Sequence, residues 1–209
     1  QNAYSTTSVT VTVPELGDLL IGQGGSGTGI DRMDDVTPNV WEEAYGTGLT
    51  NGIQTVNGAS GGTGIEWTPN MMPDGVTARV FYTPDVTGTT NADKTGSGAS
   101  STSGAGYDVT LELGEAVTGM AGLTLGGGFA STDQATTSGS GDAEDTTVYA
   151  TYAVGGLTVG YQWSEADLGT TTGAQQYDND GYGITFAVND DLSIGYNHYE
   201  SEQTNSTNV

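Results

Sequence analysis

Apolar and polar residues alternate along most of this chain, in short segments separated by glycine-rich and polar stretches. The clearest segment runs from Tyr107 to Leu113, where apolar side chains alternate with Asp108, Thr110 and Glu112. Successive side chains of a strand point to opposite faces, so this period of two predicts a strand with one apolar and one polar face. The pattern predicts ten strands, at residues 8–13, 18–23, 63–68, 76–83, 106–113, 123–129, 148–154, 157–163, 182–188 and 192–199.

The connections between these strands alternate in length. Short turns are predicted at residues 14–17, 69–75, 114–121, 155–156 and 189–191, and every other connection is a longer loop, including those at 131–145 and 164–180. A soluble β-sandwich is expected to mix its turn lengths and to carry an apolar face dense in Leu, Ile and Phe. Strict alternation indicates instead that one end of the sheet is compact and the other carries the loops.

Aromatic residues fall near the ends of the apolar rows. Tyr107, Trp163, Tyr182 and Tyr196 are predicted near the long-loop end and Trp67 near the short-turn end, as the two interfacial girdles of a membrane barrel require. The polar face is rich in Thr, Gly, Asp and Glu, which suits a water-filled interior. The sequence therefore predicts an all-β fold, an antiparallel transmembrane β-barrel. A soluble or surface-layer calcium-binding adhesin-like β-domain is the alternative.

The longest stretch without alternation is residues 24–62. It carries an acidic cluster around a single base, formed by Asp31, Arg32, Asp34, Asp35, Glu42 and Glu43. Within it, 37–44 predicts one or two helical turns, with Thr37 as the N-cap and Pro38 at the first helical position, and the rest is predicted as loop. A loop of this length in a compact domain is usually either functional or disordered.

The composition limits the partners that the chain can bind. Three Lys and Arg residues face 26 Asp and Glu residues, for a formal net charge of −23. This charge disfavours nucleic acid and anionic lipid headgroups, which need clustered cations, and makes cations the expected partners. The chain has no cysteine, which excludes a disulfide framework and thiolate metal sites. No window approaches the roughly 18 apolar residues of a membrane-spanning helix.

Two short motifs that suggest enzymes lack the structural context that they need. Residues 22–27 match the dinucleotide-binding string, but no βαβ pattern follows. Residues 58–62 match a nucleophile elbow, yet the chain has one histidine, His198, on an apolar row, and no α/β-hydrolase pattern. A glycosidase-type pair of catalytic carboxylates remains an alternative, but no feature of the sequence identifies which two carboxylates would form it. No enzyme activity is predicted.

Carboxylates are the only chemical groups that cluster in this sequence. For those outside the long loop, the favoured interpretation is that they are solvent-exposed charges rather than metal ligands. Calcium is a possible ligand for Asp142, Glu144, Asp178 and Asp180, since carboxylate oxygens suit it. However, no glutamate follows Asp178 at the spacing of an EF-hand loop. No other cofactor is expected.

Three segments resemble the Gram-negative outer-membrane porins, in particular the acidic general diffusion porins of marine alphaproteobacteria. They are 16–23 (LGDLLIGQ), 31–43 (DRMDDVTPNVWEE) and 63–69 (TGIEWTP). In those proteins, the loop that follows a strand like 16–23 folds into the pore and narrows it. The resemblance implies passive diffusion of small hydrophilic solutes and ions through a homotrimer in the outer membrane of a Gram-negative bacterium, with 24–62 as the constriction loop.

The resemblance also assigns the channel residues. The constriction would carry Asp31, Arg32, Asp34, Asp35, Glu42 and Glu43, and the pore wall Glu66, Arg79, Asp108 and Glu112. Porins of this family usually oppose the acidic loop with a cluster of Arg and Lys, whereas here only Arg79 lies on a predicted wall strand. We therefore expect a preference for cations.

The chain ends also depart from the family. Residues 205–209 lack the C-terminal aromatic strand of such porins, and the chain does not begin with Met. The expectation is one partial barrel domain over 1–209, an internal piece of a barrel of about 16 strands, with about three strands missing on each side.

Overall fold

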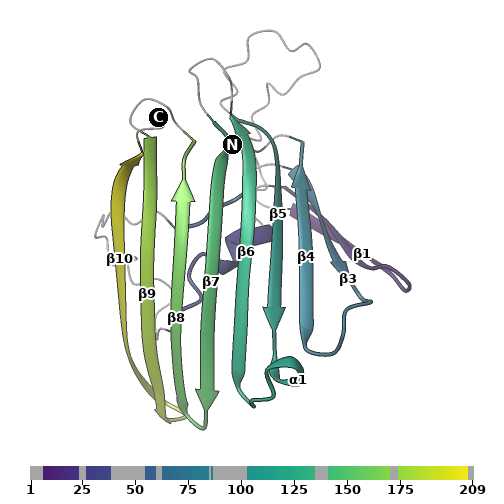
Figure 1. Ribbon diagram of the computed structural model, residues 1–209. Coiled ribbons are helices and arrows are strands. Elements are labelled where there is room, and N and C mark those ends of the chain that lie inside the picture. The colour runs from purple at the N-terminus through teal and green to yellow at the C-terminus, as the bar shows by residue number, and fades with distance from the viewer. Residues whose placement is uncertain are drawn as a thin grey trace.

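The computed structural model describes residues 7–23, 27–38, 55–59, 63–84, 86, 103–134, 141–169 and 174–206. Within these ranges, ten antiparallel strands form one sheet in chain order, each hydrogen-bonded to the next (Figure 1). The strands are β1 (Thr7–Val13), β2 (Gly17–Gln23), β3 (Thr63–Pro69), β4 (Val76–Thr83), β5 (Ser103–Leu113), β6 (Leu123–Gln134), β7 (Ala143–Val154), β8 (Leu157–Asp167), β9 (Ala174–Asn189) and β10 (Leu192–Ser206). β1 and β10 are the two edges and do not pair with each other, so the sheet is not closed.

All ten predicted strands are confirmed, but several are longer than the alternation indicated. β6 and β7 extend through much of the loop predicted at 131–145, and β8 and β9 extend through most of the loop predicted at 164–180. These extensions carry mostly polar residues and no regular apolar row, so the side-chain pattern does not reveal them. The backbone hydrogen-bond ladder continues through them regardless of side-chain polarity.

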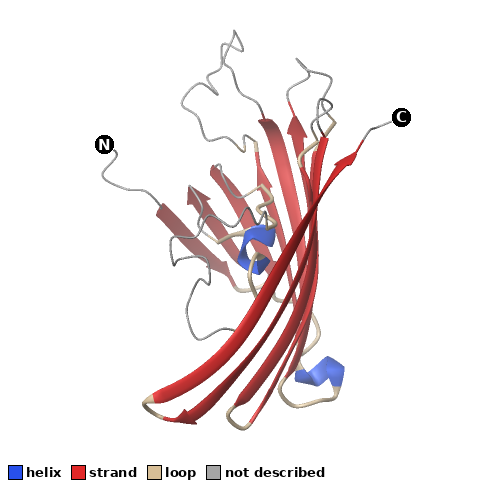
Figure 2. Ribbon diagram, turned by 90° about the vertical axis from the view of Figure 1, so that its left-hand side faces the viewer, coloured by secondary structure: helices blue, strands red, loops and turns tan. Residues whose placement is uncertain are grey.

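The sheet has an apolar convex face and a polar concave face. Figure 2 shows the sheet curving, with a short helical segment lying on its concave side. The outer row keeps large apolar side chains exposed, among them Val80, Tyr82, Tyr107, Val109 and Leu111. The inner row includes buried polar side chains, among them Asp108, Thr110, Thr147 and Gln162. This division confirms the two faces expected of a barrel wall.

One of the predicted aromatic girdles is partly wrong. β10 continues to Ser206, so Tyr196 lies closer to the short turn between β9 and β10 than to the loop end. Tyr182 lies in the middle of β9, with its ring centroid 6.3 Å from that of Tyr196. The error follows from placing the ends of these two strands too early.

Two short helices interrupt the strand pattern in the described part of the chain. η1 (Gly29–Met33), a 3-10 helix, forms where the sequence predicted loop, because Ile30 and Met33 bury their side chains completely there. α1 (Glu115–Thr118) occupies a connection predicted as a plain turn and ends at Gly119, whose φ is 68°. Of the helix predicted at 37–44, Thr37 and Pro38 are not helical and 39–44 lies outside the described residues. Among the described residues, neither helix is long and apolar enough to cross a membrane.

Candidate functional site

The two described parts of the long loop, 27–38 and 55–59, dock on the concave face of the sheet. Ile30 forms an apolar cluster with Val56 of the returning segment and Ala130 of β6, each no more than 1% exposed. Burying three apolar side chains stabilises docking, because each removes apolar surface from water. The loop is therefore packed against the wall in this part.

The start of η1 is held by carboxylates from the wall. The first N–H groups of a helix have no partner inside it, and Thr28 at the N-cap position makes no side-chain capping bond. Glu66 of β3 accepts a hydrogen bond from the Gly29 amide at 2.7 Å, and Asp108 of β5 accepts one from the Ile30 amide at 3.1 Å. The wall thus replaces the usual capping residue.

The returning segment binds to the wall in the same manner. The second oxygen of Asp108 accepts the Ala59 amide at 3.0 Å. Asp145 of β7 accepts the amides of Asn57 at 3.0 Å and Gly58 at 2.6 Å through a single oxygen. Wall carboxylates thus accept amides from both parts of the loop.

These carboxylates lie in one row of the sheet. Pairing across neighbouring strands aligns an acidic residue on every second strand with an apolar residue between; in order the row is Glu66, Phe81, Asp108, Ala130, Asp145 and Ala166. A charge-assisted hydrogen bond to a carboxylate is roughly twice as strong as a neutral one. The carboxylates of this row therefore hold the loop on the inner face of the sheet.

Two more side chains hold the middle of the loop. Gln162 of β8 accepts the Val36 amide at 3.0 Å and donates to the Met33 carbonyl and to the Thr147 hydroxyl. The hydroxyls of Thr37 and Tyr199, on β10, are hydrogen-bonded to each other. The described loop is therefore bonded to β3, β5, β7, β8 and β10.

Two glycines allow this close approach. Gly29 has a φ of +60°, and a Cβ built there would lie 1.9 Å from Oδ2 of Asp108. Gly58 has a φ of +59°, and its Cβ would lie 2.4 Å from Cγ2 of Ile30. A larger residue would be strained by its backbone and would also displace the anchor.

Both arginines among the described residues form ion pairs with wall carboxylates. Arg32 of the loop pairs with Glu66, and Arg79 of β4 pairs with Glu112 of β5 at 3.1 Å. Asp31, Asp34 and Asp35 are half-buried on the loop. Burial raises the pKa of the Asp34 carboxyl above its ordinary value, although a hydrogen bond with Asp35 partly opposes this.

The residues predicted for the pore lie in different environments in the structure. Glu66 and Asp108 lie on the inner face as predicted, but they are 3% and 0% exposed, buried under the loop rather than facing water. Their physical role in the fold is to accept loop amides. Arg79 and Glu112 lie half-buried on the same face. Glu42 and Glu43 lie outside the described residues.

Sequence reasoning missed three anchoring residues, Asp145, Gln162 and Tyr199. Asp145 was assigned to a loop, although it sits on the polar side of β7 and faces inward. Gln162 sits in a polar position between Tyr161 and Trp163, which was a usable signal for an inward side chain. Nothing in the pattern indicated that a loop residue would reach Tyr199.

The calcium candidates do not come together. Glu144 lies on β7, and Asp178 and Asp180 lie on β9, so they are not loop residues as predicted; Asp142 just precedes β7. Tyr161 donates a hydrogen bond to Asp180. Across the part of the chain that the structure describes, no group of three or more His, Asp or Glu side chains is placed to hold a metal ion. Calcium binding stays an untested prediction.

A sheet with an apolar outer face, a polar inner face and a loop packed on that inner face has the arrangement expected of a barrel wall. The model of the Gram-negative porin family matches residues 2–209. The chain belongs to this family. A search of the curated proteins found no match.

Membership places this porin in the outer membrane of a Gram-negative bacterium. Its exposed outer row then faces lipid, because the outside of such barrels is apolar and the inside is polar. Porins are channels rather than enzymes, which fits the lack of a catalytic motif in the sequence. The closer resemblance to marine alphaproteobacterial porins stays a prediction.

Proposed function

We propose that this porin is a passive channel for small hydrophilic solutes and ions, that it prefers cations, and that its docked loop is the narrowest part. The observation that carries the proposal is the pairing of Arg32 with Glu66 and of Arg79 with Glu112. Among the described residues, these are the only basic side chains apart from His198, so no unpaired arginine or lysine opposes the acidic loop. The net charge of −23 has the same sign.

The selectivity would come from the loop rather than from the whole wall. At an ionic strength of about 0.5 M the Debye length is roughly 4 Å by interpolation, so a carboxylate acts on ions only where the passage is narrow. Asp34 and Asp35 lie on the loop segment that crosses the inner face. A negative potential there attracts cations and repels anions. No step consumes energy.

The test is the reversal potential of the full-length porin in a planar bilayer under a salt gradient. We expect the combined variant Asp34→Asn, Asp35→Asn, Glu42→Gln and Glu43→Gln to lower the preference for cations. Asn and Gln match Asp and Glu in size, so this variant should fold and conduct. An unchanged reversal potential would place the filter elsewhere.

A matched control removes the same number of charges from the outer face of the sheet. Asp178 and Asp180 on β9 pair with Glu202 and Glu200 on β10, on the side opposite the loop. Neutralising these four carboxylates should leave the reversal potential near that of the unmodified protein. An equal shift in both variants would show that net charge, not the loop, sets selectivity.

The homotrimer implied by the resemblance is also a proposal. Native mass spectrometry of the detergent-solubilised protein tests it, because a single mass of one chain would contradict a trimer.

A further inference from the structure

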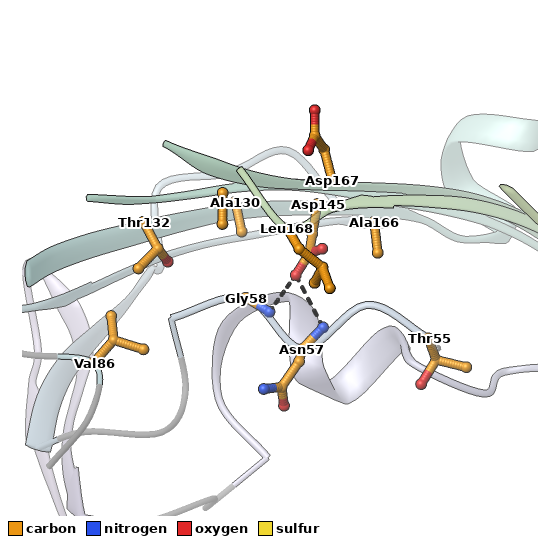
Figure 3. A pocket seen from close by; sticks show the side chains of 11 residues that line it. Thr55, Asn57, Gly58, Val86, Ala130, Thr132, Asp145, Ala166, Asp167 and Leu168 are labelled. Carbon is orange, nitrogen blue, oxygen red and sulfur yellow. Dashed lines mark hydrogen bonds between the residues drawn. The ribbon is translucent and has the colours of Figure 1, made fainter. Parts of the chain in front are cut away.

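A pocket of about 240 Å³ lies between the returning loop segment and the inner face of β6, β7 and β8 (Figure 3). Its walls include Asn57 and Gly58 from the loop, and Ala130, Asp145, Ala166 and Leu168 from the sheet side. Sites for drug-sized ligands span roughly 300–1,000 Å³. This pocket is smaller, so it suits a molecule of only a few non-hydrogen atoms.

The carboxylate of Asp145 is the charged group in this pocket that points inward. Figure 3 shows Asp145 pointing toward Asn57 and Gly58, whereas Asp167 points away on the other side of the sheet. Both loop amides bind Oδ2 of Asp145. Within the described residues, no hydrogen bond ends on its other oxygen, Oδ1.

The two residues opposite Asp145 on the neighbouring strands are small and apolar. The directly opposite residues are Ala130 on β6 and Ala166 on β8, which are 1% and 2% exposed. Val86 and Leu168 add further apolar surface. Alanine on both sides leaves space beside the carboxylate, and a carboxylate in such surroundings gains from a positively charged partner.

The described residues do not supply that partner. Arg32 and Arg79 are bound to Glu66 and Glu112, and the hydrogen bonds that Asp145 accepts from described residues come from backbone amides. A metal ion fits poorly, because calcium requires six or more oxygen ligands and magnesium about six, and this pocket offers one inward-pointing carboxylate and few other side-chain oxygens. An organic cation needs only one such carboxylate and also uses the apolar walls.

We propose that this pocket binds small organic cations, namely a primary ammonium group on a short aliphatic chain. The ammonium donates to Oδ1 of Asp145, and the chain packs against Ala130, Ala166 and Leu168. The proposal rests on the proposed function, since it makes the pocket a binding step for amines that enter the channel.

The probe is n-butylammonium, compared with 1-butanol, which has the same chain and no charge. In planar bilayers, butylammonium should reduce the potassium current of the full-length porin in a saturable manner, and butanol should not. Ligand-observed NMR on the detergent-solubilised protein measures binding without requiring conduction. A protein that binds butylammonium but does not conduct would contradict the proposed channel function and support the proposed binding pocket. Conduction without saturable block or NMR binding would contradict the pocket alone.

Two variants test the site from different sides. Asp145→Asn should raise the half-saturating concentration by about tenfold or more, as expected for the loss of one charge-assisted hydrogen bond. Ala166→Leu fills the pocket without removing the hydrogen bonds of Asp145 to the loop, and it should weaken binding similarly. If Ala166→Leu binds butylammonium as tightly as the unmodified protein, the amine does not bind in this pocket and the proposal is contradicted.

Glu144→Gln is the matched control, because Glu144 is the next residue on β7 and is exposed on the opposite face. It removes the same charge at the same height of the barrel. Its affinity for butylammonium should stay unchanged. An equal loss in Glu144→Gln and Asp145→Asn would mean that general negative charge, not the pocket, attracts the amine, and would overturn the proposal.

Discussion

Asp108 accepts the amide of Ile30 at 3.1 Å through one carboxylate oxygen, while the other oxygen accepts the amide of Ala59 at 3.0 Å. Ile30 and Ala59 belong to the outgoing and the returning segments of the loop, so one side chain of β5 fixes both. Asp108 is fully buried between them and the wall. The position of the loop in the channel therefore depends on this residue.

Replacing Asp108 by Ala should loosen the loop. The change leaves two buried N–H groups without an acceptor, which costs roughly 1–3 kcal/mol for each group. We expect larger and noisier single-channel currents, and faster entry of larger sugars in liposome-swelling assays. Thr110→Ala is the control, because Thr110 lies on the same strand and face and its buried hydroxyl has no hydrogen-bond partner among the described residues. Equal behaviour of the two variants would contradict the anchoring role.

Gly29→Ala should disturb the loop more than Gly27→Ala. Both glycines have a positive φ, +60° and +61°, so alanine carries a similar backbone penalty of about 1 kcal/mol at each. At Gly27 nothing lies within 4 Å of the added Cβ, whereas at Gly29 it would lie 2.7 Å from Cγ of Asp108. Single-channel noise should increase more in Gly29→Ala than in Gly27→Ala. The same noise in both variants would assign the effect to backbone strain alone.

The preference for cations should fall as the pH is lowered, and Asp34 should contribute early. Burial raises the pKa of the Asp34 carboxyl, so it takes up a proton at a higher pH than an exposed aspartate does, and the loop then loses one negative charge. Reversal potentials measured from neutral pH downward should show this loss. Asp34→Asn should begin with a weaker preference and change less over the first part of the titration. Parallel titration curves for the unmodified protein and Asp34→Asn would contradict an early contribution of Asp34.

The strands and their two faces were predictable from sequence because a period of two is a local property. The register was not predictable. The pattern shows which face of a strand each side chain occupies, but it does not show which residues of neighbouring strands lie opposite each other. Glu66 and Asp108 were therefore predicted on the wall, while their alignment with Asp145 in one row was not. That alignment appears only when β3 to β8 are paired.

The docking of η1 was also beyond the pattern. Gly29, Ile30 and Met33 lie within an acidic and glycine-rich stretch without periodicity, so loop was the expected state. The helix forms because Ile30 packs against Val56 and Ala130, because Met33 is buried, and because wall carboxylates cap its start. Both causes are tertiary contacts between segments far apart in the sequence.

Two lysine substitutions on adjacent residues of β9 test which face of the sheet meets the lipid. Ile184 lies 43% exposed on the outer row, whereas Thr185 lies on the inner row. A lysine facing lipid costs roughly 2–4 kcal/mol at the bilayer midplane and less toward its edges, while one facing the water-filled interior costs little. Ile184→Lys should therefore reduce insertion into lipid vesicles and lower the urea midpoint of unfolding, and Thr185→Lys should insert and fold normally. A detergent-free, monodisperse protein that tolerates both changes would contradict a lipid-facing outer row.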